Sequence, residues 1–478
     1  MKANTEDHQF VLQKSMTEIY SDWKAENQNT KLLKSKFLKM RPKNVKLQNQ
    51  RKLIQCLCEY CENVNLKITA FNNFAVRKNQ QHLRIRDKYE AINMILCEKN
   101  GEQFNKITCI EGKCVNCGTE NLSKRMEPLI IANEEIKWQK WDFVNVPNHK
   151  TGKEIKKRQL VTFFTPAQQL FVQLLDELQF LLYHLFVASW QQNQFRQLNN
   201  RPPEKTVVLT MDFAENFSCF SQNEIQGAHW AKDSVTIHPV IARYQCKNQE
   251  CNNSMVDDII DIISNDLQHD VHAVQKFTEV IIKFLREERG IDVEKMFILS
   301  DGCAAQYKSK VAFLDSSMSE VDNNIKSEKA FYGSRHGKNR CDGEGGVIKS
   351  KAARIIRNGG LINSAKDLYQ QCLCLQKELT NPDGTCNHNR RKLIWVERSN
   401  IRHVRPNRVC KTVKGTRSLH SVRGIGAGQI QVRKLTCFCG FCTATEHAEG
   451  TSSTCENEAV VGTWRSVNLN GFQHAKQE

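Results

Sequence analysis

The chain has 478 residues, 40% of them hydrophobic and only 9 of them proline, a composition that is typical of a globular protein and excludes a largely disordered one. Its 69 Lys and Arg residues outnumber its 52 Asp and Glu residues, and the formal net charge of +17 favours a polyanionic partner, above all a nucleic acid. The length predicts roughly three domains, at about 150 residues each.

The N-terminal residues, MKANTEDHQF, carry charges where a secretory signal has an apolar core, so we expect no signal peptide. A nuclear or cytoplasmic protein follows, and its 20 cysteines are then better explained as zinc ligands than as disulfides. Segment 1–52 is predicted to be a basic arm, because its stretch 31–52 contains no acid. This stretch is either the solvated face of a helix or a contact for phosphates.

A cysteine-rich region is predicted for residues 53–134. Structural zinc takes four ligands in a tetrahedron, and the C-x-x-C spacing of Cys114 and Cys117 lets two thiolates reach one ion. Seven cysteines cannot fill two such sites, so either a histidine such as His82 contributes or one thiol stays free. The alternative is that they are ordinary buried thiols. The predicted ligands are Cys56, Cys58, Cys61, Cys97, Cys109, Cys114 and Cys117.

Residues 135–204 are predicted to form a largely helical connector. Trp138 and Trp141 are expected to pack on a neighbouring element. Between 168 and 195, leucines recur at helical spacing and acids interrupt the apolar run, which favours a buried helix over a membrane span. The stretch NNRPPEK at 199–205 ends this region.

The central region, 205–360, alternates strand-like and helix-like patterns. Strands are expected at 207–211, 235–246, 256–263, 297–300 and 330–334, and helices at 270–288 and within 310–329. This alternation predicts an α/β fold with a mixed sheet, in which antiparallel early strands lie beside a later parallel one.

Three separated acids of the central region suggest a metal site. Asp212 and Asp301 each end a predicted strand, and Asp342 or Glu344 lies in a glycine-rich stretch before a predicted helix. Two magnesium ions about 4 Å apart, held by carboxylate oxygens, can activate a water and stabilise the leaving oxygen of a phosphodiester. The competing interpretation is that the acids cap turns or helices. We favour Asp342 as third acid because it lies beside His336 and Lys338.

Positive side chains near these acids would line the cleft that a nucleic-acid backbone needs. The predicted nucleic-acid contacts are Lys308, His336, Lys338, Lys349, Lys351 and Arg354.

The C-terminal region, 361–478, is predicted to contain a helix at 364–379, strands within LIWV and GQIQVRKL, and many arginines. It ends in a C-x-C-x-x-C motif with one further cysteine, which makes a complete tetrahedral ligand set. The predicted zinc ligands are Cys437, Cys439, Cys442 and Cys455.

Three stretches carry a resemblance to a known group: MDFAENFSCFSQNEIQGAHW, SDGCAAQYKSK and GSRHGKNRCDGEGG. They resemble transposon-derived animal proteins whose central region is similar to the RNase H-like core of DDE transposases. The resemblance covers the chain from about residue 53 onward, including the cysteine-rich flanks.

The resemblance implies metal-dependent cleavage and transfer of DNA strands. Asp212 matches the first acid, after strand one, and Asp301 the second, after strand four. The third position falls on Asp342 or Glu344; in such enzymes this acid lies well within a helix, whereas here it lies among glycines. The resemblance also implies two Mg²⁺ or Mn²⁺ ions, zinc-stabilised flanks, a nuclear location, DNA as partner and self-association.

Two further interpretations stay open. The chain is either such a transposase-like recombinase or a domesticated nucleic-acid-binding protein that keeps the fold and the charge without catalysis. An RNA-directed nuclease on the same RNase H-like fold ranks lower, because we see no aromatic motif for single strands.

Overall fold

The computed structural model describes residues 10–11, 16–27, 30, 32–42, 45–46, 58–99, 101–131, 133–148, 152–221, 224–225, 232–251, 254–377, 379–381, 384–444 and 454–469. The chain divides into two compact units, Met1–Cys58 and Glu59–Glu478. Cys56, one of the predicted zinc ligands, lies outside the described residues.

The first unit has two helices, α1 (Met16–Glu26) and α2 (Lys34–Lys39), and two short parallel strands, β1 (Phe10–Val11) and β2 (Val45–Lys46). The ring of Phe37 lies 5.3 Å from that of Tyr20 and 5.2 Å from that of Trp23, so aromatic packing joins the two helices. Helix α2, within the basic stretch, has no buried residue, which leaves its lysines facing solvent.

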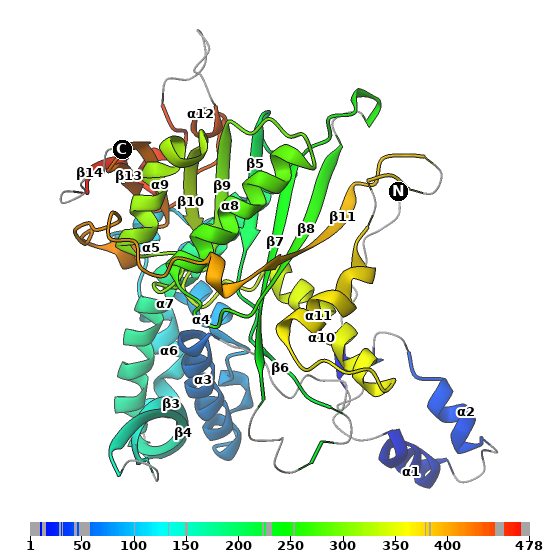
Figure 1. The fold of residues 1–478 in the computed structure, drawn as a ribbon. Coiled ribbons are helices and arrows are strands. Elements are labelled where there is room, and N and C mark those ends of the chain that lie inside the picture. Colours follow the sequence, from blue (N-terminus) through cyan, green and yellow to red (C-terminus); the bar gives the residue numbers. More distant parts are fainter. Residues whose placement is uncertain are drawn as a thin grey trace. The chain divides into compact units, whose positions relative to one another are not determined.

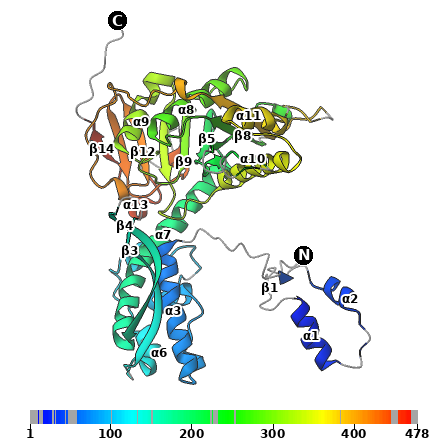
Figure 2. The same ribbon diagram turned by 60° about the horizontal axis from the view of Figure 1, so that its bottom comes forward.

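The second unit begins with helices packed around a long hairpin, grouped together in Figure 2. The strands of the hairpin are β3 (Glu135–Pro147) and β4 (Glu154–Pro166), where the sequence predicts only a connector. Trp138 is buried and its Nε1 donates to Thr165 Oγ1 across the hairpin at 2.9 Å, whereas Trp141 is exposed. The helices are α3 (Glu59–Arg77), α4 (Lys88–Ile95), α5 (Ile107–Ile110), α6 (Glu120–Ile130) and α7 (Ala167–Asn200).

Helix α7 confirms the predicted buried helix. By length and apolar composition alone it is able to cross a membrane, but 44% of its most apolar window is buried inside the protein. Leu170, Leu174 and Leu178 are fully buried. Further along, Gln191 is also fully buried and its amide donates to Phe331 O at 2.8 Å. Because a buried amide needs partners, this bond ties α7 firmly to the sheet.

The main sheet of the described chain has ten strands, in the order β11, β8, β7, β5, β9, β10, β12, β13, β14, with β6 paired to β7. Strand β7 is antiparallel to both of its neighbours, β5 and β8. Strand β9 runs parallel to β5, and β10 runs parallel to β9. This confirms the predicted mixed sheet. The strands are β5 (Thr206–Met211), β6 (Phe217–Ser218), β7 (Ser234–Gln245), β8 (Met255–Ser264), β9 (Lys295–Ser300), β10 (Lys326–Phe331), β11 (Asn389–Val396), β12 (Ser421–Gly426), β13 (Gln429–Arg433) and β14 (Arg465–Asn468).

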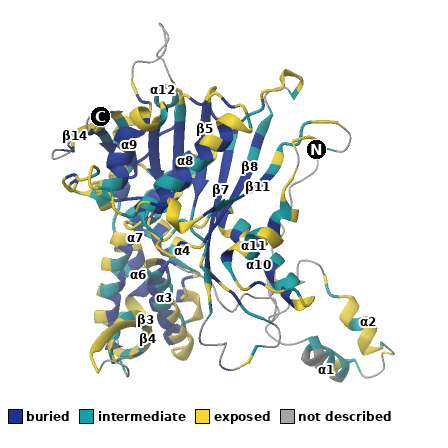
Figure 3. Cartoon of the chain, in the orientation of Figure 1, coloured by how far each residue is buried: buried dark blue, intermediate teal, exposed yellow. Residues whose placement is uncertain are grey.

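Helices cover both faces of this sheet, and its central strands are buried throughout (Figures 1 and 3). One face carries α8 (Val271–Glu287) and α9 (Lys310–Asn323), whose apolar side chains share a core with those of β5 and β9. The other face is covered by α7, by α10 (Arg340–Arg357) and by α11 (Ala365–Cys372). Two short helices, α12 (Gly440–Thr443) and α13 (Glu458–Val461), lie near the C-terminus.

Three elements differ clearly from the prediction, and the first is α11, which ends at Cys372 although the helix was expected to reach 379. Helix α9 ends at Asn323, because Asn324 adopts a left-handed conformation with φ 53°, so β10 starts at Lys326 and not at 330. Helix α10 starts at Arg340 and includes the glycine-rich stretch, which the sequence placed before the helix. A capping box between Asn339 and Asp342 begins it, and this local stabilisation outweighs the poor helix propensity of the glycines.

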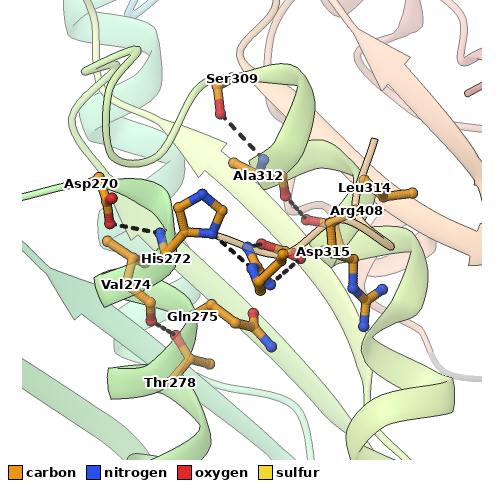
Figure 4. Close-up of polar contacts among 12 residues, drawn as sticks. Asp270, His272, Val274, Gln275, Thr278, Ser309, Ala312, Leu314, Asp315 and Arg408 are labelled. Atoms are coloured by element: carbon orange, nitrogen blue, oxygen red, sulfur yellow. Dashed lines mark hydrogen bonds and ion pairs between the residues drawn. The ribbon is translucent and has the colours of Figure 1, made fainter. Parts of the chain in front are cut away.

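The segment after β11 is bound to α8 and α9 by polar contacts. Asp270 caps α8 by accepting from the backbone N–H of His272 at 2.9 Å (Figure 4). Arg405 Nε donates to the ring of His272 at 2.7 Å, and its guanidinium makes a bidentate ion pair with Asp315 at 2.9 and 2.8 Å. Asp270 and Asp315, the two acids of this contact between the segment after β11 and helices α8 and α9, therefore both have partners.

Candidate functional site

The first two predicted acids lie side by side because of the strand register. Strands β5 and β9 are parallel neighbours in which Thr210 pairs with Leu299. Asp212 and Asp301 each follow their paired residue by two positions, so both stand just beyond the carboxyl ends of adjacent strands. Strands of this kind deliver their C-terminal side chains to one edge of the sheet.

Burial raises the pKa of Asp212 to about 7, and the nearby negative charges of Asp301 and Asp342 contribute further. Burial also raises the pKa of Asp301, with Asp342 acting in the same direction, although the carboxylate accepts from Cys303 N at 3.0 Å. Burial is the main cause of both shifts, and the charges of the neighbouring carboxylates add to it because the acids lie near one another. The chain thus concentrates negative charge at this edge of the sheet.

The two candidates for the third acid have different surroundings. Asp342 lies in the first turn of α10, where one carboxylate oxygen accepts from Asn339 N at 2.9 Å. Its charge acts on both Asp212 and Asp301. Glu344 is ion-paired with Arg391, which also pairs with Asp261 of β8. Glu344 therefore already has a cationic partner, which it shares with Asp261.

Among the described residues, no Lys or Arg forms an ion pair with Asp212, Asp301 or Asp342. Three hard oxygen donors without a protein cation suit Mg²⁺ or Mn²⁺ as donor types. The three acids are not among the described groups of cysteines, histidines and acids whose ligand atoms all lie within 4.8 Å of one another.

The predicted nucleic-acid contacts fall into two sets. Lys308 is buried, its ammonium donates to Arg417 O at 3.1 Å, and burial lowers its pKa to about 8. His336 faces a cysteine and a histidine, as described below. Lys338 and Arg354 are exposed, and Lys349 and Lys351 are partly so. This second set lies on or just before α10, so it is available to a polyanion near Asp342.

The first cysteine cluster gathers Cys97, Cys109, Cys114 and Cys117 between α4 and α6, and their four Sγ atoms lie within 4.8 Å of one another. Cys97 Sγ is 3.7 Å from Cys114 Sγ and 3.3 Å from Cys117 Sγ. The predicted C-x-x-C pair is thus completed by two cysteines, and this set can hold a structural metal such as zinc. His82 is exposed and belongs to none of the described clusters, so it contributes no ligand.

The second cluster is the predicted C-terminal set of Cys437, Cys439, Cys442 and Cys455. Beside it lies Arg433, only 2% exposed, with Nη1 at 3.6 Å from Cys442 Sγ and 3.8 Å from Cys455 Sγ. A buried guanidinium is costly unless negative charge is near. Thiolates bound to a metal supply that charge, whereas neutral thiols do not.

The third cluster differs from the prediction for CLCEYC. Cys61 of α3 lies against two histidines: its Sγ is 3.7 Å from His336 Nε2, and His184 Nε2 is 3.1 Å from the same His336 atom. Cys58 precedes Cys61 at the C-x-x-C spacing and is the fourth cysteine or histidine of this group. His184 and His336 thus complete this set, where the sequence offered only more cysteines.

A fourth cluster escaped the sequence analysis altogether. Cys246 and Cys251, between β7 and β8, meet Cys386 and His388, just before β11. His388 Nε2 is buried and has no hydrogen-bond partner among the described residues, as a ring nitrogen awaiting a metal would. The only local signal is a C-x-x-x-x-C spacing, and the second pair lies far along the chain.

One described protein family matches the chain. Residues 191–436, just over half of the chain, match the family described as domain of unknown function DUF8701. No curated protein and no solved structure matches the chain. The matched segment runs from the second half of α7 to just beyond β13 and includes all the predicted acids. The chain therefore belongs to the DUF8701 family, whose function is unknown.

Proposed function

We propose that the chain is a transposase-like DNA recombinase that cleaves and transfers DNA strands with divalent metal ions on an RNase H-like core. The observation that carries this proposal is the placement of Asp212 and Asp301 just beyond the ends of parallel strands β5 and β9, close to Asp342 and without an ion pair to any described Lys or Arg. Excess carboxylate charge at one edge of a sheet favours divalent ions.

The sheet topology supports the RNase H-like part of the proposal. Among the strands of at least six residues, β5 is the first and β9 the fourth of the main sheet, and an acid follows each. The first three are antiparallel and the fourth is parallel to the first. The proposed family has its first two acids after strands one and four.

The position of Asp342 supports its role as third acid. In transposases of this type the third acid lies on the last helix of the core, and Asp342 belongs to α10. Asp212, Asp301 and Asp342 would hold the ions, which supply an activated water or hydroxyl and stabilise the leaving oxygen. Asn339 N holds one carboxylate oxygen of Asp342 at 2.9 Å and so orients this side chain before any ion binds.

Charge supports a nucleic-acid substrate. Lys338 lies just before α10, and Lys349, Lys351 and Arg354 lie along its second half, in a chain whose formal net charge is +17. Phosphates bound by these side chains would pass near the acids. DNA as substrate, a nuclear location and self-association belong to the same proposal through the resemblance of the sequence.

The second candidate is a domesticated nucleic-acid-binding protein without catalysis. One observation favours it: Asp342 already acts as the N3 residue of a capping box, which is a structural role. Such a protein would bind DNA in a salt-dependent manner and would bind no Mn²⁺ at the acids.

The test is nicking or joining of duplex DNA by the full chain with Mg²⁺ or Mn²⁺, repeated with Asp301→Asn. The matched control is Glu215→Gln, because Glu215 lies three residues after Asp212 but its side chain is 94% exposed. We expect activity in the wild type and in the control and its loss in Asp301→Asn. Activity that survives Asp301→Asn removes this mechanism, and salt-sensitive DNA binding without Mn²⁺ binding favours the second candidate.

A further inference from the structure

The connection between β10 and α10 is held from both sides, and this carries an inference about how the acids are positioned. It runs from Tyr332 to Asn339, begins beside Ser300 and ends at the capping box of α10. Tyr332 N donates to Ser300 O at 3.0 Å, which fixes the start of the connection next to Asp301. What holds its middle therefore matters for the acids at both ends.

The helices hold one side of the connection. A Cβ atom on Gly333 would stand 2.7 Å from Cα of Ala188 in α7, so only glycine allows this close approach. Arg335 has φ 62°, an unfavourable conformation for a residue with a side chain, and it is ion-paired with Glu59 at the start of α3. Backbone strain of this kind persists only where surrounding contacts fix it.

The middle of the connection is His336, whose ring faces Cys61 of α3 and His184 of α7. Two imidazole nitrogens 3.1 Å apart, with a thiol sulfur 3.7 Å from one of them, point to one central position. A hydrogen bond between the two rings accounts for only one pair of atoms, whereas the ligand atoms of all four side chains lie within 4.8 Å of one another. A tetrahedral zinc ion takes two imidazoles and two thiolates, and C-x-x-C spacing supplies the latter.

The acids lie against the other side of the connection. A Cβ atom on Gly337, the residue after His336, would stand 3.0 Å from Cβ of Asp301. Two residues later, Asn339 caps α10 and its N–H holds the carboxylate of Asp342. Any movement of His336 is thus passed within three residues to the surroundings of two acids.

We propose that a zinc ion bound by Cys58, Cys61, His184 and His336 fixes the 333–339 connection on α3 and α7 and thereby positions Asp301 and Asp342. The zinc takes no part in chemistry, and His184 and His336 act as positioning residues. The ligand part stands on the cluster alone; the consequence for catalysis rests on the proposed function of the acids.

The experiment uses the full chain, purified without chelator, with variants His184→Ala and His336→Ala. Elemental analysis counts zinc, hydrogen–deuterium exchange follows the backbone amides of 333–342, and titration with Mn²⁺ follows the acids. We expect each variant to lose about one zinc per chain, to exchange faster in 333–342, and to bind Mn²⁺ roughly tenfold or more weakly, as when groups that orient metal ligands are removed. His184→Cys, which offers a thiolate instead, is expected to restore all three.

Cys251→Ser is the control, because it removes a ligand of the fourth cluster, between β7 and β8. It should also lose a zinc but leave the exchange of 333–342 unchanged. A zinc count equal to that of the wild type in both histidine variants overturns the site. Loss of zinc without faster exchange in 333–342 overturns the positioning role. If the wild type binds no Mn²⁺, the proposed function fails, while zinc and exchange still decide this inference.

Discussion

Two groups of acids in the same sheet differ in whether a cationic side chain pairs with them. On β8, Asp258 is fully buried and ion-paired with Arg289 at 3.0 Å, and fully buried Asp261 pairs with Arg391. At the ends of β5 and β9, Asp212 and Asp301 are partly buried, and among the described residues no Lys or Arg pairs with them. The fold gives the acids of the first group cationic partners, whereas among the described residues the acids of the second group have none.

This difference separates structural acids from candidate ligands. A buried carboxylate costs several kcal/mol unless a partner neutralises it, so an unneutralised pair persists where something else compensates. Burial and the neighbouring carboxylates raise the pKa of Asp212 to about 7, and burial raises that of Asp261 to about 6 although Arg391 opposes this shift. Glu344 belongs with the first group because Arg391 binds it, whereas Asp342 is exposed and joins the second group only through the effect of its charge on Asp212.

Replacing Asp301 or Asp212 by Asn is expected to have the largest effect. An ion held in the wrong place forfeits several kcal/mol of transition-state stabilisation, so strand cleavage should fall about a thousandfold or more. In metal-free protein the same substitutions remove like-charge repulsion, so thermal stability should stay equal or rise. Cleavage kinetics and calorimetric unfolding of each variant check both halves. An inactive variant that is also strongly destabilised would place these acids with the structural group.

Replacing Arg391 by Met is expected to show the reverse pattern. It leaves Asp261 and Glu344 without their cation in a site where the arginine side chain is only 8% exposed, so stability should fall by about 3–5 kcal/mol. Denaturant unfolding measures this loss. A small change in stability would mean that the acids of β8 do not depend on their ion pairs, and the comparison would lose its basis.

The two candidates for the third acid can be told apart by substitutions whose expected effects on cleavage are smaller. Asp342→Asn should lower cleavage by about a hundredfold or more, whereas Glu344→Gln should lower it less than about tenfold, because Glu344 already serves Arg391. Asn keeps an oxygen for the Asn339 N–H, so the helix cap survives. The two variants are compared in one cleavage assay with Mn²⁺. Equal losses would mean that both side chains serve the ions.

The smallest effect is expected at His403, where two acids share a titratable partner. Its Nδ1 lies 2.8 Å from Asp270 and its Nε2 3.1 Å from Asp266. Burial lowers the pKa of His403, but the hydrogen bonds and charges of the two acids outweigh it, so the pKa is raised. The stabilisation is therefore complete below the unfolded pKa of about 6.5 and is lost as the pH rises through the folded value.

The variant His403→Asn should accordingly melt a few degrees below the wild type at pH 6 and level with it at pH 9. Scans of thermal unfolding across this range measure the difference. A difference in melting temperature that stays constant with pH would show that His403 stabilises the contact with α8 by packing and not by its charge.

Local patterns predicted much of the fold. The apolar runs before Asp212 and Asp301 are short and end at an acid, so strand and position follow from the residues themselves. The cysteine spacing at 437–442 works in the same way. The start of α10 was wrong because three glycines oppose a helix, while the Asn339 and Asp342 capping box that begins it was not recognised.

The parts that escaped the sequence depend on distant pairings. The ligand His184 stands in an apolar helix and meets His336 only because α7 packs against the connection after β10. Cys246 and Cys386 lie close together because β8 pairs with β11, and the spacing of cysteines in the sequence does not predict this pairing. The ion pair that disfavours Glu344 as the third acid is formed with Arg391, which lies on β11. Such contacts are decided by tertiary packing, which periodicity does not report.

The parallel pairing of β5 with β9 has a consequence for the order of folding. These strands are separated in the chain by the antiparallel strands β6, β7 and β8 and by helix α8, so their pairing closes a long loop and belongs to the slow events of folding. Asp342 arrives from a still later segment. The nascent or partly folded chain therefore has no assembled acid site, and we expect cation binding to appear only at the last stage of refolding.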